Sequence, residues 1–215
     1  MSSLIQITKK CAVCGCEHTF TIVKSTNSLG HMDLDTRPAG MKRSTLLYEI
    51  QYCEHCHYAN SDISEKPTWF DEKVLSSNAY LAVVNNSELD TVAKSFLLSG
   101  YLNAAGGQFK EAGILSLKAA WIFDDKNEVQ NAIRARSKAS KYLLNYVNQK
   151  EDINTATMVV DINRRMGEFD AAREAAVQLL GFGATGLLEK ILQFEIALID
   201  AKDSECHTVG EIKGI

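Results

Sequence analysis

The sequence predicts an α+β protein, with a small β module at the N-terminus and an all-α domain of helical hairpins after it. Three observations support this fold class. Two CxxC pairs lie between Cys11 and Cys56, the segments beside them have strand character, and the chain after Pro67 is rich in alanine, leucine, lysine and glutamate at helical spacing. We therefore expect a β module over residues 1–66 and a helical domain over residues 67–215.

The composition is that of an ordinary globular protein. The chain has 215 residues, 46% hydrophobic and 23% charged, with a net charge of −4. These values exclude disordered and collagen-like classes, and they argue against capture of nucleic acid by a broad basic surface. No apolar run approaches the roughly 20 residues that cross a bilayer, and the first residues lack the apolar segment of a signal peptide. We expect a cytoplasmic protein with no membrane partner.

Two segments of the N-terminal module are expected to form strands. Residues 18–23 are rich in threonine and apolar side chains, and every second residue from Leu46 to Tyr52 is apolar or aromatic. The polar, turn-rich residues 25–44 lie between them. A loop of this length inside a compact module is uncommon and tends to be functional or mobile.

Four cysteines form the strongest chemical signal. Cys11 and Cys14 make one CxxC pair, and Cys53 and Cys56 make another. Four thiolates at tetrahedral corners are the ligand set that structural Zn²⁺ prefers, and a closed site leaves no position for water or substrate. We predict a zinc-ribbon-like module in which the metal stabilises the fold. The alternatives are cysteines buried without a metal and a thioredoxin-type redox pair, although no βαβ pattern surrounds either pair.

Other chemically reactive residues have weaker patterns. Cys16 lies two residues after Cys14 and near three histidines. We interpret these four residues as spare ligands or solvent-facing residues, and the alternative is that they form a second metal site. The histidines are His18, His55 and His57. Cys206 and His207 lie in a polar C-terminal tail and are expected to be incidental.

Three charged residues stand out in the long loop. Asp33, Asp35 and Arg37 have the composition of an acid-base or anion-binding group. The favoured interpretation is that they pin the loop through an internal ion pair.

The second half is predicted to be a series of helices. Ser87 with Asp90, and Asp125 with Glu128, have the spacing of N-cap and N3 pairs, which predicts helices that begin near Glu88 and Lys126. Further helices are expected over residues 109–123, 153–166, 169–180 and 186–201, with breaks at glycines 106, 107, 167, 181 and 183.

Two of the expected hairpins share a sequence pattern. Residues 107–125 and 167–180 each begin with a glycine, followed by an aromatic residue two positions later and an alanine three beyond that. This pattern resembles the middle of a tetratricopeptide repeat (TPR), where glycine turns the chain between antiparallel helices. The spacing of the two matches is irregular, so we predict TPR-like hairpins rather than a regular solenoid.

One motif is rejected on its context. Gly181, Gly183 and Gly186 spell GxGxxG, and Asp200 follows at the distance of a dinucleotide fingerprint. The glycines follow a helical segment rather than a strand, so a helix end, a turn and a new helix are expected, with no nucleotide cofactor.

Several segments together resemble a bacterial family of unknown function. They are CAVCG at 11–15, DLDTRP at 33–38, CEHCHYA at 53–59, LKAAWIFDD at 117–125 and RRMGEFDAA at 164–172. The combination is similar to domain of unknown function 2225, and it implies a zinc-ribbon-like N-terminus, TPR-like helices and Cys11, Cys14, Cys53 and Cys56 as metal ligands. His57 replaces the usual knuckle glycine, so it must either accept a left-handed backbone or bend the second knuckle. The family brings no known activity.

Three functions remain open at this point. The favoured one is a non-enzymatic adaptor that binds a protein or peptide on its helical surface. A basic stripe of Arg134, Lys138 and Lys141 is expected to be solvated, the alternative being contact with phosphate or with an acidic partner. The second function is a nucleic-acid-associated zinc ribbon, and the third is a thiol- or metal-dependent enzyme or redox sensor. Their candidate residues are Lys24, Arg37, Lys42 and Arg43 for the second, and His31, Asp33, Asp35 and Cys16 for the third.

Overall fold

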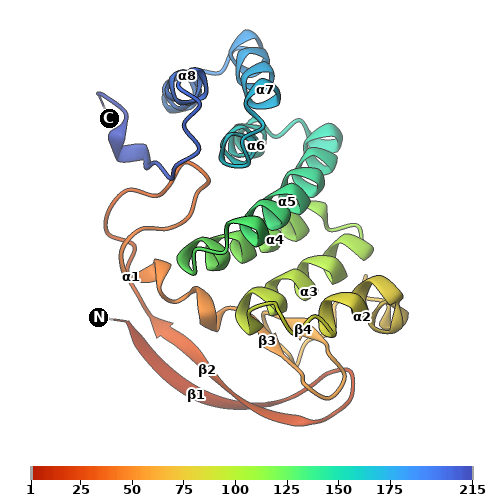
Figure 1. The fold of residues 1–215 in the computed structure, drawn as a ribbon. Helices are drawn as coiled ribbons and strands as arrows, with labels where there is room; N and C mark the ends of the chain where they lie inside the picture. The colour runs from red at the N-terminus through yellow and green to blue at the C-terminus, as the bar shows by residue number, and fades with distance from the viewer. Residues whose placement is uncertain (1, 215) are drawn as a thin grey trace.

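The computed structural model describes residues 2–214 and has the α+β fold class that the sequence predicts. Two antiparallel sheets of two strands each form the N-terminal part. The strands are β1 (Ser3–Lys10) with β2 (Glu17–Ser25), and β3 (Gln51–Tyr52) with β4 (Ala59–Asn60). The β1–β2 hairpin extends as a long curved arm along one edge of the molecule (Figure 1).

Eight α-helices follow or interrupt these strands in the described part of the chain. They are α1 (Gly40–Arg43), α2 (Asn78–Val84), α3 (Thr91–Ala105), α4 (Phe109–Asp125), α5 (Val129–Lys150), α6 (Ile153–Arg165), α7 (Phe169–Gly181) and α8 (Leu187–Asp200). Three short 3₁₀ helices are η1 (Leu46–Tyr48), η2 (Glu72–Ser76) and η3 (Val209–Glu211). From α3 onward each helix packs chiefly on its sequence neighbours, so the helices follow one another in an arc (Figure 1).

The strand predicted over residues 46–52 is wrong in its first half. Leu46–Tyr48 form η1, and only Gln51 and Tyr52 pair as a strand. Leu46 is buried in the helical core, so this segment packs the end of the loop against the helices. The strand predicted at residues 18–23 is confirmed as part of β2, whereas β1, whose residues are largely exposed, was not predicted.

Two predicted helix starts are also displaced. Asp90 is the N-cap of α3, where its carboxylate accepts hydrogen bonds from the amides of Val92 and Ala93. The next helix continues to Asp125, and α5 begins only at Val129. The two residues added to α4, Asp124 and Asp125, form ion pairs with Arg136 and Arg37, and local spacing does not reveal such pairs.

Glycines turn the chain where the sequence places the breaks. Gly107 and Gly167 have φ values of +76° and +82° and precede α4 and α7. Gly183 and Gly186 lie between α7 and α8, so the GxGxxG segment is a turn between helices, as expected. The assignment of these hairpins as TPR-like stays a prediction.

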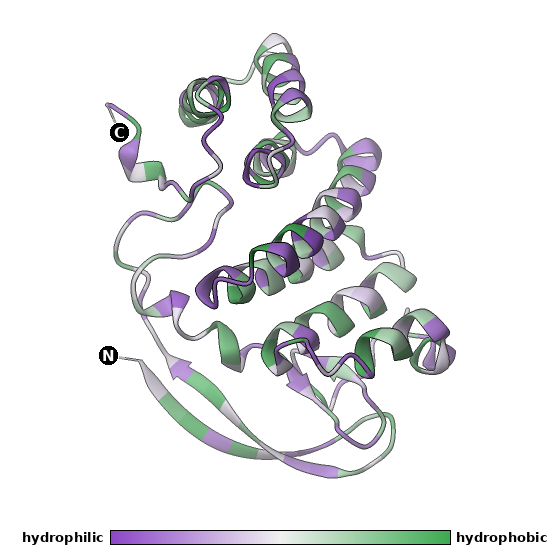
Figure 2. Cartoon of the chain, viewed as in Figure 1, coloured by the Kyte–Doolittle hydropathy of each residue, from purple (hydrophilic) through white to green (hydrophobic). Residues whose placement is uncertain are grey.

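Apolar side chains of the helices form a buried core that continues into the β module. One cluster combines Cys11, Cys53 and Ile63 with Tyr80 and Leu98 of α2 and α3. Figure 2 shows polar residues along the outer side of α5 and mixed polar and apolar residues along the β1–β2 hairpin. The division of the chain after residue 66 stays a prediction.

No helix in residues 2–214 is both long enough and apolar enough to span a membrane.

Candidate metal centre

The first cysteine knuckle is the turn that joins β1 to β2. The amide of Gly15 donates to the carbonyl of Cys11 at 2.8 Å, and the amide of Cys11 donates to the carbonyl of Cys16 at 2.8 Å. Gly15 has φ +76°, a value that glycine adopts without steric cost. This turn points the thiols of Cys11 and Cys14 toward the same point.

The second knuckle, between β3 and β4, repeats the same hydrogen-bond pattern. The amide of His57 donates to the carbonyl of Cys53 at 2.8 Å, and the amide of Cys53 donates to the carbonyl of Tyr58 at 2.9 Å. His57 has φ +65°, so it accepts the left-handed backbone where the first knuckle has glycine. Its ring nitrogen Nδ1 lies 2.6 Å from Tyr52 Oη, and its carbonyl accepts a hydrogen bond from Tyr80.

The two knuckles bring the four predicted cysteines together. The Sγ atoms of Cys11, Cys14, Cys53 and Cys56 all lie within 4.8 Å of one another. Cys11 and Cys56 are 3.6 Å apart at sulfur, and Cys14 and Cys53 are 3.5 Å apart. A tetrahedron with metal–sulfur bonds of about 2.3 Å has edges of about 3.8 Å, so this donor set fits a tetrahedral metal ion.

The electrostatics of the cluster favour a cation. Burial raises the pKa of Cys53 and of Cys56. Burial also opposes ionisation of Cys14, but the backbone amide of Cys16 and the neighbouring thiols outweigh it and lower the pKa of Cys14 to about 6. Since four thiolates this close repel one another, a divalent cation is the group that would allow all of them to ionise.

Residues around the cluster connect it to the rest of the module. His18 Nε2 lies 3.2 Å from Cys53 Sγ, so this imidazole can donate a hydrogen bond to sulfur. The backbone of Ile63 accepts from the amide of Ala12 at 2.9 Å and donates to the side chain of Gln51 at 2.9 Å. Neither Gln51 nor Ile63 carries a sequence signal for this role, because the contact joins distant parts of the chain.

A second group of possible ligands lies beside the first. Cys14, Cys16 and His55 each offer a donor atom within 4.8 Å of the others. Cys14 belongs to both groups, and His55 is exposed whereas Cys11 and Cys53 are buried. The four-cysteine set is therefore the better enclosed site.

The charged residues of the loop are buried and anchor the loop to the helices. Asp33 pairs with Arg43 at the end of the loop. The other two reach the helices: Asp35 accepts a hydrogen bond from Trp121 Nε1 at 2.6 Å, and Arg37 pairs with Asp125 at 2.5 Å. In the described chain no ion pair joins Asp33, Asp35 and Arg37 to one another, so the three residues pin the loop through other partners than expected.

The C-terminal tail is bound to this loop. Cys206 Sγ donates to Asp33 Oδ2 at 3.2 Å, and the amide of Leu34 donates to the carbonyl of His207 at 3.0 Å. His207 also contacts Asp203 and Glu211. Cys206 and His207 therefore both take part in docking the tail, a structural role that the sequence did not predict.

The residues considered for a thiol-dependent enzyme do not form one site. Cys16 belongs to the first knuckle, whereas Asp33 lies against Cys206 and Arg43. Within residues 2–214 no hydrogen bond joins Cys16 to His31, Asp33 or Asp35.

A family comparison agrees with the resemblance seen in the sequence. The model of domain of unknown function 2225, described as an uncharacterized protein conserved in bacteria, matches residues 4–192. The chain belongs to this family. The matched part of this DUF2225 protein contains the four clustered cysteines and the long loop, and it ends within α8. No curated protein and no solved structure gives a significant match to the chain.

Proposed function

We propose that the protein is a zinc-stabilised, non-enzymatic interaction protein, in which a four-cysteine Zn²⁺ site supports the N-terminal module and the helices bind a partner protein. The observation that carries this proposal is the cluster of four sulfur atoms, because a tetrahedral ion bound by all four would have no coordination position left for a substrate. A bound Zn²⁺ would neutralise the thiolates and cross-link two knuckles whose paired cysteines are 39 and 45 residues apart in sequence.

The cluster lies where such a cross-link would support the helices as well. Cys11 and Cys53 are 2% and 0% exposed, and they belong to the apolar cluster that includes Tyr80 of α2 and Leu98 of α3. Ordering of the knuckles therefore contributes to the packing of the first helices.

Metal content tests the zinc site. We expect about one zinc per chain in protein purified without added metal. Cys53→Ser should lose the metal and lower the unfolding midpoint by roughly 10 °C or more, because metal binding adds directly to folding free energy. Cys16→Ser is the matched control and should keep the metal. Protein without zinc, or Cys53→Ser protein that retains it, would contradict the four-cysteine assignment.

The partner site that we propose is a groove between α2, α3 and α5. It has a volume of about 580 Å³, and its apolar lining is Val83, Leu89, Leu97, Phe123 and Ile133. Arg134 and Lys138 of the basic stripe also line it, and neither has an ion-pair partner within residues 2–214. Glu88 is the one acidic residue among the described lining residues, so the lining carries a net positive charge. The charge complement of such a groove is an acidic segment with apolar side chains, presented by a partner protein.

Selection of peptides from a random display library tests this groove. We expect the selected sequences to combine acidic with apolar residues. Their affinity should fall about tenfold or more in Lys138→Glu, because the substitution replaces an attractive charge by a repulsive one. Lys141→Glu changes the same charge on the same helix outside the groove, and it should bind as the unchanged protein does. Selected peptides that bind Lys138→Glu as tightly as they bind the unchanged protein would refute the site.

Two ion pairs favour a protein partner over nucleic acid. Of the four basic residues considered for phosphate contacts, Arg37 is buried in a pair with Asp125 and Arg43 is paired with Asp33. Only Lys24 and Lys42 of that set remain exposed without an ion pair in the described chain. Two lysines provide a small part of the positive charge that nucleic-acid binding needs.

A further inference from the structure

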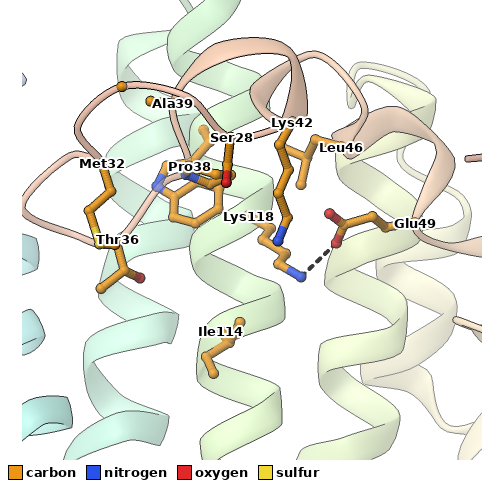
Figure 3. Close-up of a pocket in the computed structure, with 12 residues that line it drawn as sticks. Ser28, Met32, Thr36, Pro38, Ala39, Lys42, Leu46, Glu49, Ile114 and Lys118 are labelled. Atoms are coloured by element: carbon orange, nitrogen blue, oxygen red, sulfur yellow. Dashed lines mark hydrogen bonds and ion pairs between the residues drawn. The ribbon is translucent and has the colours of Figure 1, made fainter. Parts of the chain in front are cut away.

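A second hollow lies between the long loop and α4. It has a volume of about 530 Å³, within the range of small-molecule sites. Residues of the loop, of η1 and of α4 line it, and none of them lines the groove between α2, α3 and α5 or belongs to the cysteine cluster. Figure 3 shows side chains from the loop and from α4 converging on this cavity.

The loop wall of the cavity is held in a strained conformation. Thr36 lines the cavity at φ +71°, a value that a β-branched residue rarely adopts. Its neighbours Asp35 and Arg37 are 0% and 5% exposed and are bonded to Trp121 and Asp125. Strain of this kind persists where the surroundings enforce it, and it concentrates at ligand sites.

The far wall is equally rigid. Trp121 lines the cavity while its indole N–H is bonded to Asp35 and its ring lies 5.9 Å from the Arg37 guanidinium. Leu46 and the half-buried Ile114 extend this apolar surface. Trp121 and Leu46 are 3% and 5% exposed, so only an edge of each side chain faces the cavity. A flat apolar group entering the cavity would therefore meet surfaces that are already in place, which reduces the entropic cost of binding.

The charged end of the cavity carries an excess of positive charge. Lys118 pairs with Glu49 at 2.6 Å, and Figure 3 shows the Lys42 side chain directed toward the same two groups. Lys42 has no carboxylate partner within residues 2–214, so two ammonium groups face one carboxylate. An oxyanion that entered here would complete the pairing.

We propose that this cavity binds a small organic anion, with a carboxylate or phosphate group at Lys42 and Lys118 and a flat apolar body against Trp121, Leu46 and Ile114. The pinned loop then has a role as the preformed wall of the site. This binding site is separate from the proposed peptide groove and does not depend on it.

Titration of the full-length, metal-loaded protein with model ligands tests the site. The probes are phenyl phosphate, benzoate, inorganic phosphate and uncharged benzyl alcohol. The readout is the indole N–H resonance of Trp121, identified by its persistence in Trp69→Phe, since the chain has two tryptophans. We expect saturable shifts with phenyl phosphate or benzoate. Binding of inorganic phosphate and benzyl alcohol should be about tenfold or more weaker, because inorganic phosphate lacks the apolar ring and benzyl alcohol lacks the anionic group.

Substitution of the lysine locates the binding. Lys42→Met should weaken binding of the better aromatic anion about tenfold or more. Lys42 is exposed, so this change leaves folding intact, and Lys141→Met on α5 serves as the control with unchanged affinity. Stronger binding of phenyl phosphate than of benzoate identifies a phosphate ester as the ligand class, and the reverse order identifies a carboxylate. Absence of saturable shifts, equal binding of benzyl alcohol, or wild-type affinity in Lys42→Met would each overturn the proposal.

Discussion

His57 shows how a single side chain compensates for an unfavourable backbone. It stands where the first knuckle has Gly15, and both residues have positive φ. The left-handed backbone conformation raises the free energy of a non-glycine residue by about 1 kcal/mol or more. Its hydrogen bond with Tyr52 and the bond from Tyr80 to its carbonyl offset this cost and tie the knuckle to α2.

Arg164 is a fully enclosed basic residue of the helical domain. Its side chain is 0% exposed and pairs with Asp161 at 2.5 Å and with Glu195 at 2.7 Å. The same guanidinium donates to the carbonyls of Asp203 and Glu205 in the tail. Burial raises the pKa of both carboxyl groups, that of Glu195 to about 9, and the charge of Arg164 opposes this shift.

Removal of the Arg164 charge should therefore be severe. We expect Arg164→Met to lower the free energy of unfolding by about 3–5 kcal/mol, because it leaves two buried carboxyl groups and the carbonyls of Asp203 and Glu205 without their hydrogen-bond donor. Arg173→Met is the control: Arg173 pairs with Asp200, but both side chains are more than half exposed, and the loss should stay below about 1 kcal/mol. Urea denaturation of the two variants measures both values, and similar losses would contradict this account.

Among the helices, α6 begins with a cap that is also an ion pair. The Asp152 carboxylate accepts hydrogen bonds from the amide and hydroxyl of Thr155 and pairs with Lys110 of α4 at 2.8 Å. Lys110 is the main reason that the pKa of Asp152 falls to about 2; the bonds from Thr155 add to its effect, and burial opposes it. The start of α6 is thus bound to the preceding hairpin.

This lowered pKa predicts an acid-sensitive contribution to stability. Its sign follows from the direction of the shift: the contribution is present above the ordinary value of 3.8 and is lost as the pH falls toward about 2. Asp152→Asn keeps an N-cap side chain but cannot ionise. The stability difference between the unchanged protein and Asp152→Asn should therefore shrink between pH 3.8 and pH 2. A difference that stays constant in urea titrations across this range would disprove the assignment.

The C-terminal tail is joined to the long loop of the N-terminal module by backbone contacts. Val209 donates its amide to the carbonyl of Met32, and Asp33 forms an isolated β-bridge with Thr208. Figure 1 shows the tail returning from α8 to the loop that follows β2. The arc of helices is therefore closed on one side by two irregular segments.

The tail should loosen as the pH rises through the titration of His207. Burial lowers the pKa of His207, but hydrogen bonds with Glu211 and Asp203 outweigh it and raise the pKa above 6.5. The stabilisation is thus fully present below 6.5 and is lost as the pH rises through the raised value. We expect a decrease below about 1 kcal/mol in the opening free energy of the tail, measured by amide hydrogen exchange. In His207→Gln the opening energy should not change with pH over this window, and a change that persists there would exclude His207 as its cause.

Local spacing was sufficient for much of the architecture. The CxxC pairs, the strand at residues 18–23 and the helices that begin at Ile153 and Phe169 depend on contacts between near neighbours in sequence, and the structure has them as predicted. The first half of the strand predicted at residues 46–52 failed because the burial of Leu46 against the helices outweighs its local alternation.

The contacts of the loop and the tail could be identified only in the tertiary structure. Asp35 meets Trp121 across 86 positions, and Arg37 meets Asp125 across 88. No periodicity connects residues so far apart, because such pairs form only when the packing of helices brings them into contact. The four cysteines could be assigned together from their repeated spacing, whereas the cavity beneath the loop exists because two distant surfaces meet.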